Sequence, residues 1–268
     1  MMSNKIVEAL NVQVIGSGEN SVMFGHGLGT DQSIWQRILP YFNNGTYRLI
    51  LYDLACSGSV KPELFNFNKY ATIDGYVDDM IDILTALGVH RCTFVGHSAS
   101  AMTGILAAIR RPELFSKLIL VGASPRLVND VEYNGGAEEA QVGKIFAAME
   151  ADYAAWADSS APVAVGADLP EAIQEYSRTL LNTRPDIASY ALRTFVNTDL
   201  RGLLGHVRVP CHIVQTARDP SVPISAAGYL WRHLGGQTTF EILRTEGHLP
   251  HLTAPTLLGP AIQRALLQ

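Results

Sequence analysis

Residues 94–100, with the sequence Phe-Val-Gly-His-Ser-Ala-Ser, constrain this chain more than any other segment. We expect a short apolar strand over residues 92–95, then a turn of small residues, then a helix over residues 99–110. This order is typical of a nucleophile elbow, a sharp strand-to-helix turn that raises a serine above the carboxyl ends of a parallel sheet. The usual pattern is G-x-S-x-G, and Ser100 stands where the second glycine would be. Because serine is also small, the turn can still form, and Ser98 is the candidate nucleophile.

Two residues farther along the chain have the types and the order that a serine nucleophile requires. The serine hydroxyl needs a base to take its proton, and the base needs a carboxylate to fix its tautomer. Asp219 follows an expected strand over residues 212–216, and His248 follows another over residues 239–243. Active-site groups of open α/β sheets gather at the carboxyl ends of such strands. The order Ser98, Asp219, His248 is the one expected after an elbow serine, so these residues form the candidate triad.

Members of this triad also have simpler interpretations. Loop aspartates commonly form turns or cap helices, and Asp219 directly precedes Pro220. The chain has eight histidines, and a single histidine is more often structural than catalytic. Glu246 is a competing carboxylate, although it lies only two residues from His248, and His251 is a competing base that we expect to pack beneath the loop. The position of the triad residues after the right strands, in the right order, favours the catalytic interpretation.

A glycine-rich loop follows the expected strand over residues 22–24. Its sequence over residues 25–31 is Gly-His-Gly-Leu-Gly-Thr-Asp. Glycines let backbone amides approach a ligand closely, so we predict that the N–H groups of Leu28 and Ala99 bind an oxyanion. An ordinary loop and a phosphate cradle are the alternatives. The phosphate alternative fails because the loop has neither a G-K-[ST] motif nor the third glycine of a dinucleotide fingerprint.

Length, charge and cysteine content restrict the classes of function. A chain of 268 residues is long enough for one α/β domain with a sizeable core. Its net charge of −5 argues against nucleic acid or an anionic membrane as the main partner. There is no apolar run of about 18 residues, the length of a membrane-spanning helix. Cys56, Cys92 and Cys211 have no metal-binding or disulfide spacing, which favours a reducing intracellular compartment, and we predict no metal and no cofactor.

Strands and helices alternate along most of the chain. Strands are expected over residues 47–51 and 118–121, in addition to those named above. Between Ile73 and Leu87 the apolar residues are spaced as one face of a helix, which Gly88 closes. This alternation predicts a mostly parallel sheet with helices on both faces.

The alternation stops over residues 129–196, where the pattern is helical without a clear strand. Helices are expected here over residues 139–156, 169–182 and 185–194, and the alternation resumes at Pro210. We therefore predict a single domain over residues 1–268 with an all-helical lid inserted at 129–196. The Gly135–Gly136 pair is either a hinge of this lid or an ordinary turn.

Short sequence blocks spread over nearly the whole chain point to one family. The blocks are G-H-G (25–27), G-T-D-Q-S (29–33), L-Y-D-L (51–54), Y-V-D-D (76–79), G-A-S-P-R (122–126), N-T-D-L-R-G (197–202) and E-G-H-L-P-H-L (246–252). They resemble the plant strigolactone receptors of the α/β-hydrolase superfamily, and less closely the related karrikin receptors and bacterial stress-regulator hydrolases. The last two blocks lean toward the strigolactone branch. The resemblance implies the α/β-hydrolase fold.

The resemblance further implies a hormone receptor that slowly hydrolyses its own ligand. In that family the serine attacks the butenolide ring of a strigolactone, the enol-ether link breaks, and a tricyclic lactone departs. A fragment of the ring can remain on the histidine, here His248. The lid then rearranges and binds a leucine-rich-repeat F-box protein and a repressor, which is ubiquitinated. A cytoplasmic and nuclear location, and a monomer in the absence of ligand, are implied as well.

Other functions stay open. One alternative is an ordinary metabolic carboxylesterase or lactonase that has no protein partner, and another is a diverged paralogue with a different butenolide ligand. A third is a binding protein whose triad is a relic, against which the intact Ser98, Asp219 and His248 argue.

The implied ligand pocket differs from the family pattern. Four positions where the family is expected to have an aromatic side chain hold other residues here, namely Leu28, Leu127, Ala137 and Ser160. Ala99 replaces the usual valine, and Phe195 and Val196 stand in the reverse of the usual order. Each lost ring enlarges the pocket and removes roughly 1–3 kcal/mol of potential ligand burial. The residues expected to line this pocket are His97, Leu127, Ala137, Tyr153, Trp156, Ser160, Phe195, Val196, Ser221 and Val222.

Overall fold

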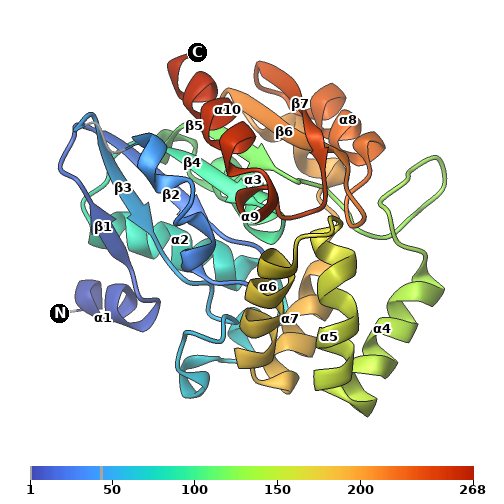
Figure 1. The fold of residues 1–268 in the computed structure, drawn as a ribbon. Helices are drawn as coiled ribbons and strands as arrows, with labels where there is room; N and C mark the ends of the chain where they lie inside the picture. Colours follow the sequence, from blue (N-terminus) through green and yellow to red (C-terminus); the bar gives the residue numbers. More distant parts are fainter. Residues whose placement is uncertain (1, 43–44) are drawn as a thin grey trace.

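The computed structural model describes residues 2–42 and 45–268. Figure 1 shows a central sheet flanked by helices, with a further group of helices below it in that view. In this described part of the chain, seven strands form one sheet in the order β1-β3-β2-β4-β5-β6-β7. The β1–β3 pair is antiparallel, and the other neighbouring pairs are parallel. The strands are β1 Gln13–Ile15, β2 Asn20–Gly25, β3 Tyr47–Leu51, β4 Cys92–His97, β5 Phe115–Val121, β6 Cys211–Arg218 and β7 Thr238–Glu246.

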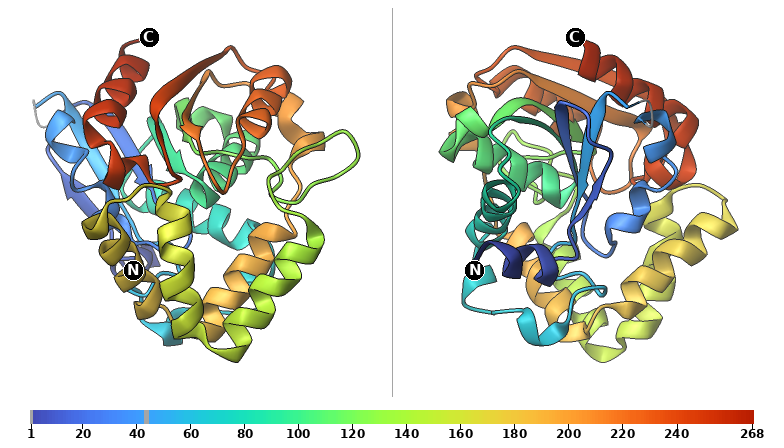
Figure 2. Two further views of the ribbon diagram at one scale, coloured as in Figure 1. Left: turned by 45° about the vertical axis from the view of Figure 1, so that its right-hand side comes forward. Right: turned by 90° about the vertical axis from the view of Figure 1, so that its left-hand side faces the viewer.

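The core lies on both faces of the sheet because the side chains of a strand alternate between its faces. In β2, Met23 packs into one apolar cluster, while Val22 and Phe24 pack into the other. Helices α2, α3 and α8 cover the first face, and α9 and α10 cover the second, as the right-hand view of Figure 2 shows. The helices outside the additional layer are α1 Met2–Ala9, α2 Asp74–Ala86, α3 Ala99–Arg110, α8 Ile224–His233, α9 Pro250–Thr253 and α10 Pro255–Leu267. The predicted mostly parallel sheet with helices on both faces is confirmed.

A layer of helices lies between β5 and β6 in the sequence and forms its own block in both views of Figure 2. Its members are α4 Glu139–Ala151, α5 Tyr153–Val165, α6 Pro170–Asn182 and α7 Pro185–Val196. The expectation of one helix over residues 139–156 is wrong, because helix α4 ends before Asp152 and helix α5 begins after it. Asp152 has an extended backbone, and its side chain accepts the N–H of Ala155, so it caps α5 instead of continuing α4.

Some elements gave too weak a sequence signal to be predicted. Strand β1 is three residues long and exposed throughout, so no apolar alternation marks it. Strand β5 begins at Phe115, three residues before its expected start. Short 3-10 helices also occur, over Gln32–Trp35, Leu39–Phe42, Pro62–Leu64, Lys69–Ala71, Pro112–Leu114 and Arg201–His206. Among the described residues, no helix is both long enough and apolar enough to cross a membrane.

Candidate active site

The turn between β4 and α3 places Ser98 in a strained conformation. Ser98 has φ 52° and ψ −113°, in a region that residues with a side chain rarely adopt. The turn requires small neighbours, since a Cβ on Gly96 would lie 2.5 Å from the Phe94 ring and 2.9 Å from the carbonyl oxygen of Ser100. Ser100 itself packs against Gly25, and its hydroxyl donates to the carbonyl of His26 at 2.5 Å. The departure from G-x-S-x-G therefore adds a buried hydrogen bond to the loop beside the elbow.

The three residues of the predicted triad form one hydrogen-bonded chain. His248 Nε2 lies 2.9 Å from the Ser98 hydroxyl oxygen, and His248 Nδ1 lies 2.8 Å from Asp219 Oδ2. With a carboxylate as its partner, Nδ1 carries the proton, which leaves Nε2 free to accept the proton of the serine. The geometry is that of a nucleophile, a base and an orienting carboxylate.

The carboxylate of Asp219 is buried and held in place by its own loop. Its side chain is 1% exposed. Oδ1 accepts the backbone N–H groups of Ser221 at 2.8 Å and Val222 at 2.9 Å, and the Gln215 side chain donates to Oδ2 at 3.2 Å. These donors satisfy the oxygens of a carboxylate that is almost fully buried. Ser221 and Val222, which were expected in the pocket, thus hold Asp219 through their backbones.

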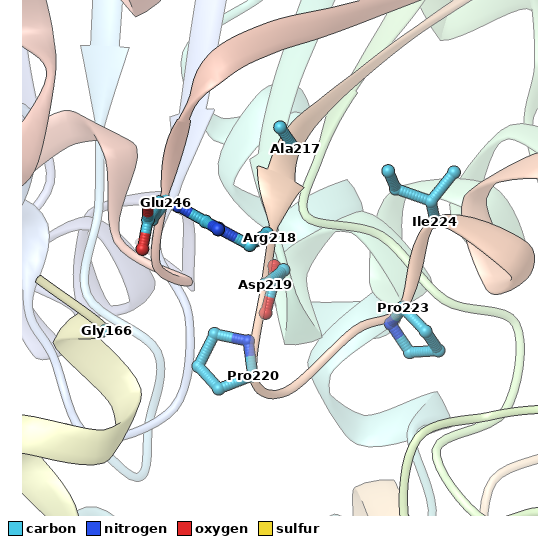
Figure 3. A pocket seen from close by; sticks show the side chains of 8 residues that line it. All are labelled: Gly166, Ala217, Arg218, Asp219, Pro220, Pro223, Ile224 and Glu246. Carbon is cyan, nitrogen blue, oxygen red and sulfur yellow. Dashed lines mark ion pairs between the residues drawn. The ribbon is translucent and has the colours of Figure 1, made fainter.

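The competing carboxylate, Glu246, faces another partner. It forms an ion pair with Arg218 at the surface, and Figure 3 shows this pair beside Asp219 in a shallow pocket. The Arg218 side chain is largely exposed, and the Glu246 side chain is about half exposed. Among the described residues, Asp219 is the carboxylate that contacts the His248 imidazole.

The competing base, His251, lies beneath the site. It is fully buried, with its ring 5.0 Å from Trp35 and 4.4 Å from His97 between ring centroids. Burial lowers the pKa of His251 to about 3, so this ring is neutral. Burial also holds the pKa of His97 well below its usual value, and the neighbouring histidines lower it further. His97 donates from Nε2 to the backbone carbonyl of His248 at 2.8 Å. It therefore holds the loop that carries His248 instead of lining a cavity.

The loop that carries Leu28 is fixed by buried polar contacts. His26 accepts the N–H of Leu54 at Nε2 at 2.9 Å, and its Nδ1 faces the carbonyl of Gly27 at 2.8 Å. The Thr30 hydroxyl donates to the same carbonyl. A Cβ on Gly27 would lie 2.6 Å from His97 Nδ1, so a larger residue would push the loop away from the elbow.

A cavity of about 20 Å³ lies directly at Ser98. The predicted oxyanion donors Leu28 and Ala99 both line it, and Ala99 is the first residue of α3, where backbone N–H groups lack partners within the helix. The remaining lining residues are Met102, Gly122, Ser124, Leu127 and Phe195. Leu127 and Phe195 were expected in the pocket, whereas Met102 and Ser124 were not.

A second cavity, of about 120 Å³, lies between Leu28 and the helical layer. The predicted pocket residues Tyr153 and Trp156 line it. Leu28 borders both cavities. The other lining residues are Gly29, Cys56, Met149, Tyr176, Leu180, Thr183, Ala188, Ala191 and Leu192. Of these, Tyr176 and Leu180 are four residues apart on α6, a spacing that could have indicated an apolar helix face.

Several predicted pocket residues are not among the described residues that line either cavity, namely His97, Ala137, Ser160, Val196, Ser221 and Val222. Ala137 lies in the loop before α4 and exchanges backbone hydrogen bonds with Leu127 and Asn129. Ser160 lies beside the buried stripe of α5, which consists of Ala157, Ala161 and Val165.

The loop before α4 contains the Gly135–Gly136 pair. The Asn129 side chain accepts both glycine N–H groups, at 2.8 Å and 3.0 Å. Gly136 has φ 108°, a conformation that favours glycine. These contacts describe an ordered turn, and a hinge role for the pair remains a prediction.

The three cysteines lie apart from the candidate triad in their state and surroundings. Cys56, Cys92 and Cys211 are free and buried, and burial raises the pKa of each thiol to about 12. Within the described ranges, no group of three or more His, Cys, Asp or Glu side chains is arranged to hold a metal ion. The described site is therefore built from Ser98, His248, Asp219 and backbone donors.

Comparison with known proteins extends over nearly the whole chain. The model of the alpha/beta hydrolase family matches residues 22–258. Strigolactone esterase D14 of Arabidopsis thaliana is 58% identical over 266 residues, which cover 99% of this chain and 99% of that protein. Strigolactone esterase RMS3 of Pisum sativum is 58% identical over 268 residues and 100% of both chains. Among solved structures, a hydrolase from Oleispira antarctica has a TM-score of 0.95 and 28% identity, covering 99% of this chain and 97% of that one.

Proposed function

This chain belongs to the alpha/beta hydrolase family and, within it, to the group of plant strigolactone esterases, and from that premise we propose that it is a receptor for a strigolactone-type butenolide that also slowly hydrolyses its ligand. The observation that carries the proposal is the hydrogen-bonded chain from Asp219 through His248 to Ser98, which ends at a cavity with mostly apolar walls. The full-length similarity to two strigolactone esterases supports the ligand class.

In the proposed reaction, the Ser98 oxygen attacks the carbonyl carbon of the butenolide ring while its proton moves to His248 Nε2. Asp219 keeps the imidazole in the required tautomer and stabilises the imidazolium. The developing oxyanion lies between the N–H groups of Leu28 and Ala99. Collapse of the tetrahedral intermediate breaks the ring C–O bond and leaves the opened ring as an ester on Ser98. The freed ring oxygen becomes an aldehyde oxygen as the bond to the enol-ether oxygen breaks, and the tricyclic lactone departs as an enol that takes the proton from His248. The acyl fragment can pass from Ser98 to the neutral His248 imidazole, and attack by water on its carbonyl carbon releases it as a carboxylic acid.

The size of the cavities bears on how a ligand enters. The space at Ser98, about 20 Å³, is near the 10–15 Å³ that a single water molecule needs. A butenolide ring therefore requires a shift of Leu28 or of the helical layer. We propose that residues 129–196 act as a lid and that a ligand favours the lid state for which it has the higher affinity.

The proposed signalling step follows from such a lid equilibrium. The rearranged lid would present a surface to a leucine-rich-repeat F-box protein and to a repressor protein. We further propose a cytoplasmic and nuclear location, and a monomer before ligand binds. Full-length similarity to strigolactone esterases supports this proposal at the level of the ligand class.

Release of the tricyclic lactone from a racemic strigolactone analogue tests the proposed reaction. We expect slow release by the wild-type protein and none above background by Ser98→Ala, which should still bind the analogue. Binding is followed by isothermal titration and release by chromatography. Release by Ser98→Ala at the wild-type rate would show that Ser98 is not the nucleophile.

A metabolic carboxylesterase or lactonase is the second candidate, and the lining of the cavity at Ser98 favours it. Leu28 and Leu127 stand there in place of the expected aromatic side chains, which fits a different ester or a diverged butenolide ligand. Steady-state turnover separates the candidates. A metabolic enzyme should reach on the order of 10 turnovers per second on its own substrate, whereas a receptor that uses each ligand once can be far slower.

A further inference from the structure

The backbone of His248 forms one hydrogen bond with the sheet and one with the helical layer. Its carbonyl accepts from the His97 ring, which belongs to strand β4. Its N–H donates to the carbonyl of Ala164, in the last turn of helix α5, at 3.0 Å. The residue that carries the base thus joins the sheet to the helical layer, and both contacts act on the main chain directly beside the imidazole.

The contact with α5 is a close approach of two backbones. Gly166 ends α5 with φ 64°, and a Cβ there would lie 2.8 Å from the Cα of Gly247. Gly247 has φ 90°, and a Cβ there would lie 1.8 Å from the carbonyl oxygen of Val165. Figure 3 shows Gly166 at the end of its helix, across from Pro220 of the Asp219 loop. With no side chain between them, a shift of the helix end is transmitted directly to the residue before His248.

Helices α6 and α7 have their own links to the rest of the molecule. The Thr179 hydroxyl of α6 donates to the carbonyl of Gly29 at 2.7 Å. In α7, the Tyr190 and Thr194 hydroxyls donate to the carbonyls of Phe67 and Tyr70. For α4 and α5, by contrast, the bond from His248 to Ala164 is the one hydrogen bond to the sheet side within the described residues.

We propose that Ala164, Gly166 and Gly247 are positioning residues, through which the docking of α5 sets the place of the His248 imidazole. This inference rests on the proposed function in taking Ser98 and His248 as the catalytic pair. Proton transfer requires His248 Nε2 to stay within about 2.6–3.2 Å of the serine oxygen. A ligand or partner that lifts α5 therefore also weakens the triad, so an opened lid and fast hydrolysis exclude each other.

Gly166→Ala tests the inference, with Gly88→Ala as its matched control. Both glycines have nearly the same backbone, φ 64° and 63°, but nothing lies within 4 Å of a Cβ on Gly88. Two readouts are independent of the natural ligand, namely the rate at which a fluorophosphonate probe labels Ser98 and the kinetics on 4-nitrophenyl acetate. We expect Gly166→Ala to lower the labelling rate and kcat by about 10- to 100-fold with KM little changed. Gly88→Ala should retain the wild-type kcat.

A second pair of variants covers the case in which Gly166→Ala does not fold. Val165→Ala loosens the end of α5 without backbone strain, and Val77→Ala removes the same group from α2; both valines are fully buried. We expect similar losses of melting temperature in this pair, but a lower kcat in Val165→Ala alone. The low-field proton NMR signal of His248 Nδ1–H should also broaden in Val165→Ala and remain in Val77→Ala.

The outcomes separate this inference from the proposed function. If the probe fails to label the wild-type protein, the proposed triad is wrong and the inference falls with it. If the wild type is labelled, but folded Gly166→Ala and Val165→Ala react as fast as their controls, the positioning role is wrong while the triad stands. Selective loss of kcat in a variant of the α5 end supports the role.

Discussion

The sheet side and the helical side of the active site differ in how firmly their groups are held. On the sheet side, Ser98 and Asp219 follow strands buried on both faces, and the Asp219 carboxylate accepts two backbone N–H groups and a side-chain amide. On the helical side, Met149 is the buried residue of α4, and α5 buries two alanines and a valine. The sheet side therefore holds the triad side chains firmly, whereas α4 and α5 bury few side chains and contribute to the wall of a cavity.

The largest effect is expected from the sheet side, at Asp219. Asp219→Asn keeps the size of the side chain but removes the charge that orients His248 and stabilises its protonated form. We expect kcat to fall by about 10⁴-fold with ligand binding retained, measured as hydrolysis and as titration of the same analogue. If the asparagine variant hydrolysed at the wild-type rate, Glu246 would become the candidate carboxylate.

The same truncation on the two sides should have unequal costs. Leu118 is fully buried in β5, whereas Leu180 of α6 is buried but borders the larger cavity. We expect Leu118→Ala to lower the free energy of unfolding by about 3–5 kcal/mol. We expect Leu180→Ala to lower it by less than about 3 kcal/mol, because the Leu180 side chain already borders a cavity and loses fewer contacts. Urea unfolding monitored by circular dichroism measures both. Equal losses would show that the helical side is packed as tightly as the sheet.

Acid should destabilise the protein through buried histidines on the sheet side. Burial lowers the pKa of His26, His97 and His251, and residues 139–196 contain no histidine. The unfolded chain takes up these protons near the ordinary histidine pKa of about 6.5, whereas the folded protein does so only at lower pH. Stability is thus complete above pH 6.5 and falls below it, by up to about 1.4 kcal/mol per pH unit for each histidine.

Urea unfolding at a series of pH values between about 7.5 and 5 measures this loss. His251→Gln serves as the comparison, because it removes one of the buried titrating rings and should flatten the slope. A free energy of unfolding that stayed constant over this range would contradict neutral, buried histidines beneath the site.

The smallest effect concerns the strain at the elbow. Ser98→Gly removes the side chain at a position with φ 52°, a backbone conformation that glycine adopts without steric strain. We expect this inactive variant to gain about 1–2 kcal/mol in the free energy of unfolding relative to Ser98→Ala, measured by urea unfolding. A glycine variant no more stable than the alanine variant would mean that the turn stores little strain.

The sequence predicted the sheet side better than the helical side, for a physical reason. Ser98, Asp219 and His248 each follow a strand, and apolar strands followed by polar loops are visible in a single sequence. The break at Asp152 was missed because apolar spacing alone does not separate a capping aspartate from one on a helix surface.

The pocket was predicted less well because its residues were assigned from the family pattern alone. Ser160, which was predicted to line the pocket, is the neighbour in sequence of Ala161 in the buried stripe of α5. Ala137, which was also predicted there, lies in a loop. The hydrogen bond from the His248 N–H to the Ala164 carbonyl joins two backbones. It therefore depends on no particular side chain and cannot be predicted from the residue types. In the sequence this contact is marked only by Gly166 and Gly247. A glycine that permits a close approach of two backbones cannot be distinguished, from the sequence alone, from a glycine in an ordinary turn.

Thermal melting with and without a racemic strigolactone analogue, on the wild type and on Ser98→Ala, tests most directly whether hydrolysis at the sheet side loosens the helical side. A ligand that only binds the native state raises the melting temperature through mass action. We predict that the analogue lowers the melting temperature of the wild type and does not lower that of Ser98→Ala. The same shift in both proteins, or no shift while a generic ester is still hydrolysed, would contradict a receptor whose lid responds to its own catalysis.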